Sequence, residues 1–359
     1  MTGGIHMKQR ITSFDTFRAV AAFIIVFLHY PLLNRFTDEA QVLVRIAVPY
    51  FFMVSGYFHY STKELKSKKI LKELKKIIGL TIIVNIVYLI LRLSVKSYYC
   101  IQNRQDLHRL WSRIFSQLAR PRYIWFNFGL AGHLWYLRAM IFVVIVFAIM
   151  KKFKLEKFVK YSIPLIIIAD LCLCKYSKAL YGWHYPRRIL EPLEKFIGVG
   201  YSYFFMGYFY RQFEQTERFE KMKKAITKSP VIPAVMVIAA AVLNVLEAKW
   251  LDSHKWNVQP YNYIGTLLLI VVIFMILSCY KTLGSKTGIH IIGQKYSEYI
   301  YFYHVLCGKL FAIFLKEKAI YPYYLKVRPF VIYLTVMFVT MFFMWCKRVL
   351  KKEMKLQEM

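Results

Sequence analysis

Long apolar runs recur along the whole chain and leave few folds open to it. They cover residues 16–34, 41–60, 74–95, 131–150, 159–174, 193–210, 231–249, 261–280, 296–315 and 328–346. An uncharged run of roughly 18 residues or more can cross a bilayer as a helix. Inside lipid, every backbone polar group must be hydrogen-bonded within the protein, which excludes open sheets. The sequence therefore predicts an all-α integral membrane protein with about ten transmembrane helices.

The positive charge of the chain is distributed in a way that predicts its orientation. The formal net charge is +32, from 51 Lys and Arg residues against 19 Asp and Glu residues. In a soluble chain this balance would suggest a nucleic-acid partner, but here the cations cluster between alternate apolar runs. The clusters are Lys63–Lys76, Lys151–Lys160, Arg211–Lys228, Lys281–Lys286 and Lys347–Lys355. The positive-inside rule predicts that these clusters and both termini are cytoplasmic, with the lipid bilayer, not nucleic acid, as partner.

The remaining organisation is simple. Residues 1–6 are interpreted as a remnant of an expression tag, and residues 7–359 as a single transmembrane domain without a cleavable signal peptide. Residues 96–130 are expected to form an external loop, in which 107–118 has the pattern of an amphipathic helix at the headgroup layer. Asp170 and Glu247 lie near external helix ends and are expected to be solvated. The six cysteines have no metal-ligand spacing, so no metal is predicted.

The first apolar run contains three polar residues that are costly to place in lipid. Asp15, Arg18 and His29 all lie in this run, and ionisable residues inside membrane helices usually mark function. Arg18 and His29 are eleven residues apart, so they return to within roughly 20° of one helix face and lie roughly 16 Å apart along the axis. Asp15 lies one turn from Arg18 on the same side. The stripe formed by Asp15, Arg18 and His29 along this face could contact the two ends of a long ligand.

Five short blocks, taken in order, resemble the membrane acyltransferase-3 family. They are DTFRAVAAFIIVFLH at 15–29, PYFFMVSGY at 49–57, HLWYL at 133–137, FFMG at 204–207 and YSEYIYFYH at 296–304. Each block alone is weak, but the five together span nearly the whole chain. The resemblance implies a membrane-bound O-acyltransferase (EC 2.3.1 class) of the bacterial inner membrane. Such an enzyme transfers a short acyl group, acetyl in the first instance, from cytoplasmic acyl-CoA to a hydroxyl of an extracytoplasmic or membrane-bound glycan or glycolipid.

Coenzyme A carries phosphates at one end and its thioester at the other, which suits the first-helix stripe. Arg18 is expected to bind the phosphates, and His29 to act as general base at the thioester and acceptor hydroxyl. Asp15 is interpreted as the ion-pair partner of Arg18, and His29 could instead be a structural histidine of the bundle. Lys75 and Lys76 are further candidates for the phosphates, although a plain positive-inside cluster explains them equally well.

Six residues are candidates for contact with the acceptor or the acyl group. They are Ser55, Arg45, His133, Trp135, Arg138 and His304. Ser55 is a possible nucleophile, but packing is its favoured interpretation. Snorkelling is the favoured interpretation of Arg45. His133 and Trp135 lie at the mouth of their helix, where a tryptophan is expected without any function. His304 could assist proton transfer or be structural. Arg138 stands where family members usually have a neutral residue, and either pairs with a carboxylate such as Glu298 or serves a particular substrate.

Two functions other than acyl transfer also fit the sequence. The segments around 45–58 and 133–137 are similar to the membrane half of the serine racemases linked to vancomycin resistance, which implies transport of an amino acid. Export of a surface glycan is a third possibility. A transporter needs no contact with CoA and would tolerate loss of Arg18, so binding and consumption of acyl-CoA discriminate between these functions.

Overall fold

The described part of the chain is built from helices. The computed structural model describes residues 11–32, 37–61, 67–104, 106–120, 130–182, 187–256 and 263–357. No strand occurs among these residues, which agrees with the all-α prediction. The segment 1–6, interpreted above as a tag remnant, lies outside the described residues.

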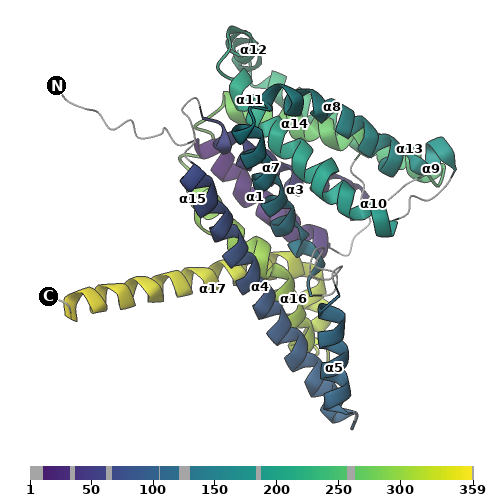
Figure 1. Ribbon diagram of the computed structural model, residues 1–359, viewed down its shortest axis with the longest axis vertical. Helices are drawn as coiled ribbons and strands as arrows, with labels where there is room; N and C mark the ends of the chain where they lie inside the picture. Colours follow the sequence, from purple (N-terminus) through teal and green to yellow (C-terminus); the bar gives the residue numbers. More distant parts are fainter. Residues whose placement is uncertain are drawn as a thin grey trace. The chain divides into compact units, whose positions relative to one another are not determined.

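The chain divides into two compact units, and the first contains residues 1–51, 216–251 and 260–359. Its helices are α1 (Thr12–His29), α2 (Thr37–Leu43), η1 (Val44–Ile46), the start of α3 (Ala47–His59), α12 (Glu217–Thr227), α13 (Val231–Ser253), α14 (Ile264–Cys279), α15 (Ile289–Lys295), α16 (Ser297–Leu315) and α17 (Tyr321–Gln357). α1 packs against α14, α15, α16 and α17 (Figure 1). Part of the core of this unit lies between α1, α16 and α17, where Val26, Ile300 and Ile332 are fully buried.

The second unit contains residues 52–215 and 252–259. Its helices are the rest of α3, α4 (Ser67–Gln102), α5 (Leu107–Leu118), η2 (Gly132–Leu134), α7 (Trp135–Lys152), α8 (Glu156–Asp170), η3 (Leu171–Lys175), α9 (Ser177–Tyr181), α10 (Arg187–Leu193), η4 (Glu194–Tyr201) and α11 (Ser202–Phe213). α7 packs against α4 and η4, and α11 packs against α8. The segments η3 and η4 are π-helical, a conformation that is often found at functional sites.

Seven helical stretches among the described residues are long and apolar enough to cross a bilayer. They are Thr12–His29, Glu39–His59, Lys68–Gln102, Gly132–Lys152, Val231–Ser253, Ser297–Leu315 and Tyr321–Leu350. These stretches indicate a multi-pass membrane protein. The other three predicted runs overlap α14, which has 16 residues, and two stretches that contain η3 or η4. The count of ten and the cytoplasmic termini therefore remain predictions.

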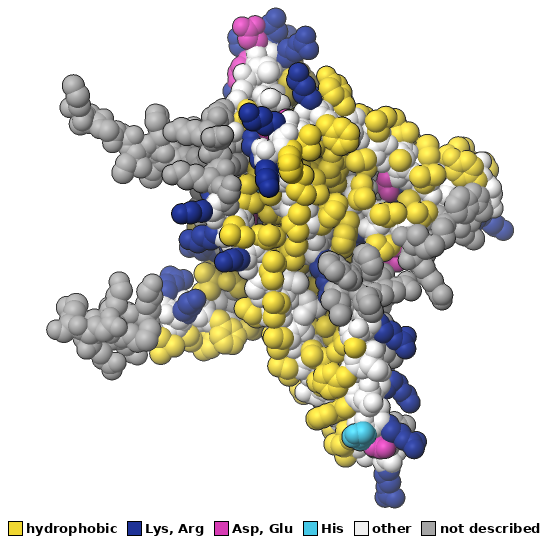
Figure 2. Space-filling model, viewed as in Figure 1, with side chains coloured by type: hydrophobic (Ala, Val, Ile, Leu, Met, Phe, Trp, Pro, Cys, Tyr) yellow, Lys and Arg dark blue, Asp and Glu magenta, His cyan; other side chains and the backbone are white. Residues whose placement is uncertain are grey.

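The predicted amphipathic helix is present as α5, with the predicted bounds. Ile114 of α5 is buried, and the indole nitrogen of Trp111 donates to the Ser97 hydroxyl of α4 at 2.9 Å. Figure 2 shows hydrophobic side chains along α4 and Lys and Arg side chains over α5. One face of α5 therefore packs on α4, while its position at the headgroup layer remains a prediction.

A proline explains the irregular start of α3. Pro49 has no backbone N–H, so it cannot bond the carbonyl of Arg45, four residues earlier. The chain forms the 3-10 turn η1 at this point, over Val44–Ile46. The helical stretch nevertheless continues through Pro49 to His59. The proline therefore interrupts the α-helical hydrogen bonding locally without ending the span.

Two glycines allow α3 and α11 to approach each other closely. A Cβ added to Gly56 would overlap the backbone carbonyl of Phe204, and one added to Gly207 would overlap that of Met53. Small residues commonly permit such close helix contacts in membranes. The two glycine motifs seen in the sequence, at 49–57 and 204–207, therefore meet at one packing interface within the second unit.

Replacing Gly207 by alanine is expected to destabilise this interface. The added methyl group meets backbone atoms of Met53, which cannot rotate away, and overpacking of this kind costs about 1–3 kcal/mol. We expect a lower unfolding temperature of the purified protein in detergent. Gly79→Ala is the matched control, because a Cβ there has no neighbour within 4 Å and alanine is the better helix former. Equal unfolding temperatures for Gly207→Ala and wild type would contradict the close approach.

Candidate functional site

The start of α1 contains the ion pair that the sequence predicts. Arg18 Nη1 donates to Asp15 Oδ1 at 2.9 Å, and the Asp15 side chain is largely buried. The backbone of Asp15 lies against Gly293 of α15, where a Cβ would overlap its carbonyl. The Tyr50 hydroxyl donates to the carbonyl of Phe14 at 2.6 Å. The pair is therefore fixed to a well-packed part of the first unit.

The end of α1 brings together three of the predicted residues. The ring centroids of His29 and His304 lie 5.0 Å apart, with the rings tilted by 43°. The charge of Arg45 in η1 also acts on the His29 ring. His29 is exposed, whereas His304 is fully buried. Residues from helices nearly 300 positions apart in sequence thus form one polar cluster, which we call the histidine cluster (His29, His304 and Arg45).

The hydrogen bonds of His304 indicate its tautomer. Its Nδ1 atom lies 3.0 Å from the carbonyl oxygen of Ile300 and 2.8 Å from that of Tyr301. A carbonyl oxygen can only accept, so the neutral ring is assigned a proton on Nδ1. The basic lone pair then belongs to Nε2. His304 is thus held by its own helix in an orientation that leaves Nε2 as its proton acceptor.

Two residues near the histidine cluster were not predicted. The Tyr30 hydroxyl donates to the carbonyl of Val305 at 3.2 Å. Arg328 of α17 donates from Nε to the carbonyl of Pro31 at 3.0 Å, and its guanidinium lies 5.9 Å from the Tyr30 ring centroid. These contacts connect the segment after α1 with both α16 and α17. The sequence does not indicate which backbone carbonyls accept these hydrogen bonds.

The other predicted residues lie in the second unit, and Ser55 has a structural environment there. Its carbonyl oxygen lies 2.7 Å from Nδ1 of His59, and Nε2 of His59 lies 3.0 Å from Oε1 of Glu73. Ser55 precedes Gly56, which contacts α11. Ser55 takes part in these contacts through its backbone, so packing and substrate contact both remain predictions for its side chain.

His133 lies in η2, and Trp135 is the first residue of α7. His133 is buried, and its Nε2 lies 3.4 Å from the Tyr88 hydroxyl. The Trp135 ring lies 6.1 Å from the ring of Phe52, and the Lys195 ammonium lies 5.6 Å from the Trp135 centroid. Both residues are therefore integrated into the packing of α3, α4, η4 and α7.

Arg138 lines a cavity of about 750 Å³ within the second unit. The cavity is bounded by side chains of α4, α7, α10 and η4. Arg138 belongs to this unit and Glu298 to the first, so the suggested pairing of these two residues remains a prediction. The sequence indicated that Arg138 was unusual but not that it borders a cavity.

Lys75 and Lys76 lie in the first turns of α4 and are exposed. Lys68, Lys69 and Lys72 are exposed on the same part of the helix. This arrangement leaves the cluster accessible to a soluble anion. It is equally compatible with the topological role of a positive-inside cluster.

Sequence reasoning missed a buried charge cluster at the two π-helical segments. Lys175 of η3 and Glu194 of η4 form an ion pair, and both are almost completely buried. Their charges also act on Asp170 at the end of α8, whose Oδ1 atom is buried without a hydrogen-bond partner among the described residues. The expectation that Asp170 is solvated was therefore wrong, because Gly198 of η4 packs directly against its carboxylate.

Glu247 was likewise expected to be solvated, and its side chain is half-buried. Its Oε2 atom accepts a hydrogen bond from the backbone N–H of Gly265 at 2.5 Å. Gly265 also lies against the backbone of Asn244. The Glu247 carboxylate therefore satisfies an otherwise unbonded amide at the start of α14, which a sequence pattern does not reveal.

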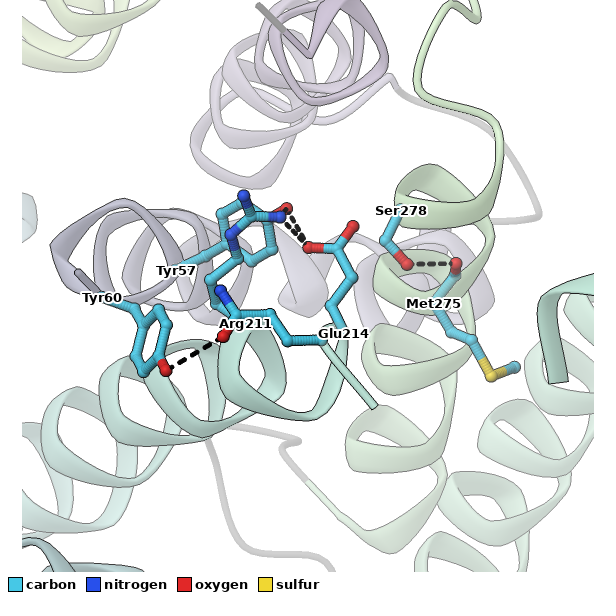
Figure 3. A network of polar contacts seen from close by, with 7 residues as sticks. Tyr57, Tyr60, Arg211, Glu214, Met275 and Ser278 are labelled. Atoms are coloured by element: carbon cyan, nitrogen blue, oxygen red, sulfur yellow. Dashed lines mark hydrogen bonds and ion pairs between the residues drawn. The ribbon is translucent and has the colours of Figure 1, made fainter. Parts of the chain in front are cut away.

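A second unpredicted network joins α3 to the end of α11, as Figure 3 shows. The Tyr57 hydroxyl donates to Oε2 of Glu214 at 2.5 Å. Arg211 Nη1 donates to the same hydroxyl at 2.7 Å and is ion-paired with Glu214. The signal available in the sequence was an Arg and a Glu three residues apart at the end of an apolar run. Their tyrosine partner, over 150 positions earlier, could not be identified.

The predicted site residues are divided between the two units. Asp15, Arg18, His29, Arg45 and His304 belong to the first unit, and Ser55, Lys75, Lys76, His133, Trp135 and Arg138 belong to the second. The structure therefore groups the predicted residues of the first unit along α1. No group of three or more potential metal ligands occurs among the described residues.

Comparison with known proteins gives one match. The model of a family described as an acyltransferase domain matches residues 11–349. The matched region includes all eleven predicted site residues. No curated protein and no solved structure matches the chain.

Proposed function

Because this chain belongs to the acyltransferase-3 family, we propose that it transfers a short acyl group, acetyl in the first instance, from cytoplasmic acyl-CoA to a hydroxyl. The acceptor is an extracytoplasmic or membrane-bound molecule of the cell surface, a glycan or glycolipid, and the protein works in the cytoplasmic membrane of a bacterium. The observation that carries this proposal is the arrangement of α1. One continuous helix has the Asp15–Arg18 pair near its start and the histidine cluster at its end.

The two ends of α1 suit the two ends of acyl-CoA. Arg18 and His29 are separated by eleven residues of unbroken helix, or roughly 16 Å. The planar guanidinium of Arg18 can form bidentate bonds to a phosphate, and Asp15 holds it in place. His29 lies at the other end of the helix, beside His304. The nucleotide end of the donor is thus assigned to Arg18 and the thioester to the region of His29.

In the proposed reaction, His29 removes the proton of the acceptor hydroxyl. The hydroxyl oxygen attacks the thioester carbonyl, a C–O bond forms, the C–S bond breaks, and CoA leaves as a thiol after it receives the proton. An imidazole is suited to this role because the unprotonated nitrogen of its neutral ring can accept a proton. His304 and Arg45 support the orientation of His29 and the binding of the acceptor. No metal is required in this scheme.

Replacing Arg18 by alanine is expected to weaken binding of acetyl-CoA about 10- to 100-fold. The reason is that charge-assisted hydrogen bonds contribute about 1.5–3 kcal/mol, and each 1.4 kcal/mol corresponds to a factor of ten. The dissociation constant would be measured by calorimetry on the purified protein in detergent. Arg18→Lys should show a smaller loss, because lysine keeps the charge but lacks the bidentate fork.

A matched control separates this effect from a general loss of positive charge. Arg109 lies on α5 with a highly exposed side chain, so Arg109→Ala should bind acetyl-CoA as the wild type does. Equal affinities for Arg18→Ala and wild type would remove Arg18 from the donor site.

A further inference from the structure

The cavity of the second unit has walls that suit a hydrocarbon chain. It measures about 750 Å³, within the usual range for small-molecule sites. Most of its lining is aliphatic or aromatic, including Ile141, Phe142 and Phe196. Two other lining residues, Ile82 and Ile86 of α4, have exposed side chains. The cavity is therefore apolar inside and borders the outer surface of a membrane-spanning helix.

The polar residues in the lining, Thr81, Asn85 and Arg138, indicate what the ligand carries besides hydrocarbon. Arg138 contributes a guanidinium, and ionisable residues in membrane-spanning helices usually mark function. Asn85 donates from Nδ2 to the carbonyl of Thr81 at 2.8 Å. Its Oδ1 atom is buried and has no hydrogen-bond partner among the described residues. The cavity thus offers one cation in a mainly apolar lining, and the buried Asn85 Oδ1 atom does not face it.

The order of the lining residues along α7 indicates which end of the cavity is charged and which is apolar. Arg138 is only six residues from the start of the Gly132–Lys152 span, so it lies near one membrane interface. Ile141 and Ile145 follow on the same helical face, and Ile145 is roughly 10 Å deeper than Arg138. Both also line the cavity. A charged head at Arg138 and an apolar chain along the isoleucines would match this order.

We propose that this cavity binds a membrane lipid with a phosphate headgroup, whose phosphate pairs with Arg138 and whose hydrocarbon chain lies between α4 and α7. Phosphate is favoured because the guanidinium fork binds it through two parallel hydrogen bonds, and because the surrounding bilayer supplies such lipids. Lipid binding here does not depend on acyl transfer, because it needs neither acyl-CoA nor the histidine cluster.

The test uses the full-length protein in a neutral detergent, without acyl-CoA, and hexadecyl phosphate as the probe. Binding is measured by native mass spectrometry across a titration, with hexadecanol and inorganic phosphate as the separate halves of the probe. We expect hexadecyl phosphate to bind at least tenfold more tightly than either half. Arg138→Gln should lose about tenfold in affinity, and Arg138→Lys should lose less.

Two further variants keep the result interpretable. Ile141→Trp should prevent binding by filling the cavity, even if Arg138→Gln does not fold. Lys152→Gln removes an exposed cation from the end of the same helix and should bind like the wild type. The proposal is overturned if Arg138→Gln and Ile141→Trp both bind the probe as tightly as the wild type, or if hexadecanol binds equally well.

Discussion

Replacing His29 by alanine is expected to lower the turnover of acyl transfer by about 10²- to 10⁴-fold, the usual contribution of a general base. The affinity for acetyl-CoA should change little, because the proposed phosphate contacts are made at the other end of α1. The measurement is the rate of CoA release with an acceptor alcohol present, together with the dissociation constant for acetyl-CoA. A fall in turnover with intact binding is the signature of a group that acts on the reacting atoms.

The alternative role of His29 as a structural histidine gives a different result. If His29 is a structural histidine, its removal should lower the unfolding temperature and also weaken donor binding. His108→Ala is the matched control, since this histidine is exposed on α5 and should leave turnover unchanged. If His29→Ala retains wild-type turnover, the histidine cluster is not the site of acyl transfer.

The second large effect is expected at the buried pair in η3 and η4. Lys175→Met leaves the Glu194 carboxylate buried without its cation, and breaking a buried pair in this way costs about 3–5 kcal/mol. We expect a strongly lowered free energy of unfolding in a detergent-based unfolding titration. Lys157→Met, which removes an exposed lysine from α8, should stay within about 0.5 kcal/mol of the wild type.

A double variant distinguishes loss of the pair from damage to packing. Lys175→Met combined with Glu194→Leu removes both charges, and replacing a whole buried pair by apolar residues is often neutral or stabilising. The double variant should therefore recover most of the stability that Lys175→Met loses. The contrary result is a double variant whose loss of stability equals the sum of the losses for Lys175→Met and Glu194→Leu alone. In that case the lysine stabilises the unit through its packing and not through its charge.

The sequence was most informative about features that depend on a single helix. The apolar runs predicted the helices, and the spacing of Asp15 and Arg18 predicted their ion pair. The amphipathic pattern of 107–118 predicted both ends of α5. Each depends on helical periodicity, which is local. The number of membrane crossings was less accessible, because η3 and η4 interrupt two of the runs and α14 is short.

Features that depend on tertiary packing could not be predicted. His29 and His304 meet because α1 packs against α16, and no local pattern indicates which distant helices are neighbours. Lys175 directly follows the apolar run 159–174, and that position does not reveal its buried contact with Glu194. Glu194 did carry a signal, since it lies inside the apolar run 193–210. An ionisable residue in such a run usually has a partner, but the sequence does not indicate which residue that is.

Incubating the purified wild-type protein in detergent with acetyl-CoA and an acceptor alcohol tests the central claim most directly. Acyl transfer predicts that free CoA accumulates over many turnovers, with one acetyl ester formed for each CoA released. The same protein with His29→Ala should bind acetyl-CoA and release almost no CoA. If the wild type neither binds nor consumes any short acyl-CoA, from acetyl to octanoyl, the proposed acyl-CoA-dependent transfer is wrong, and a transport function becomes the better explanation.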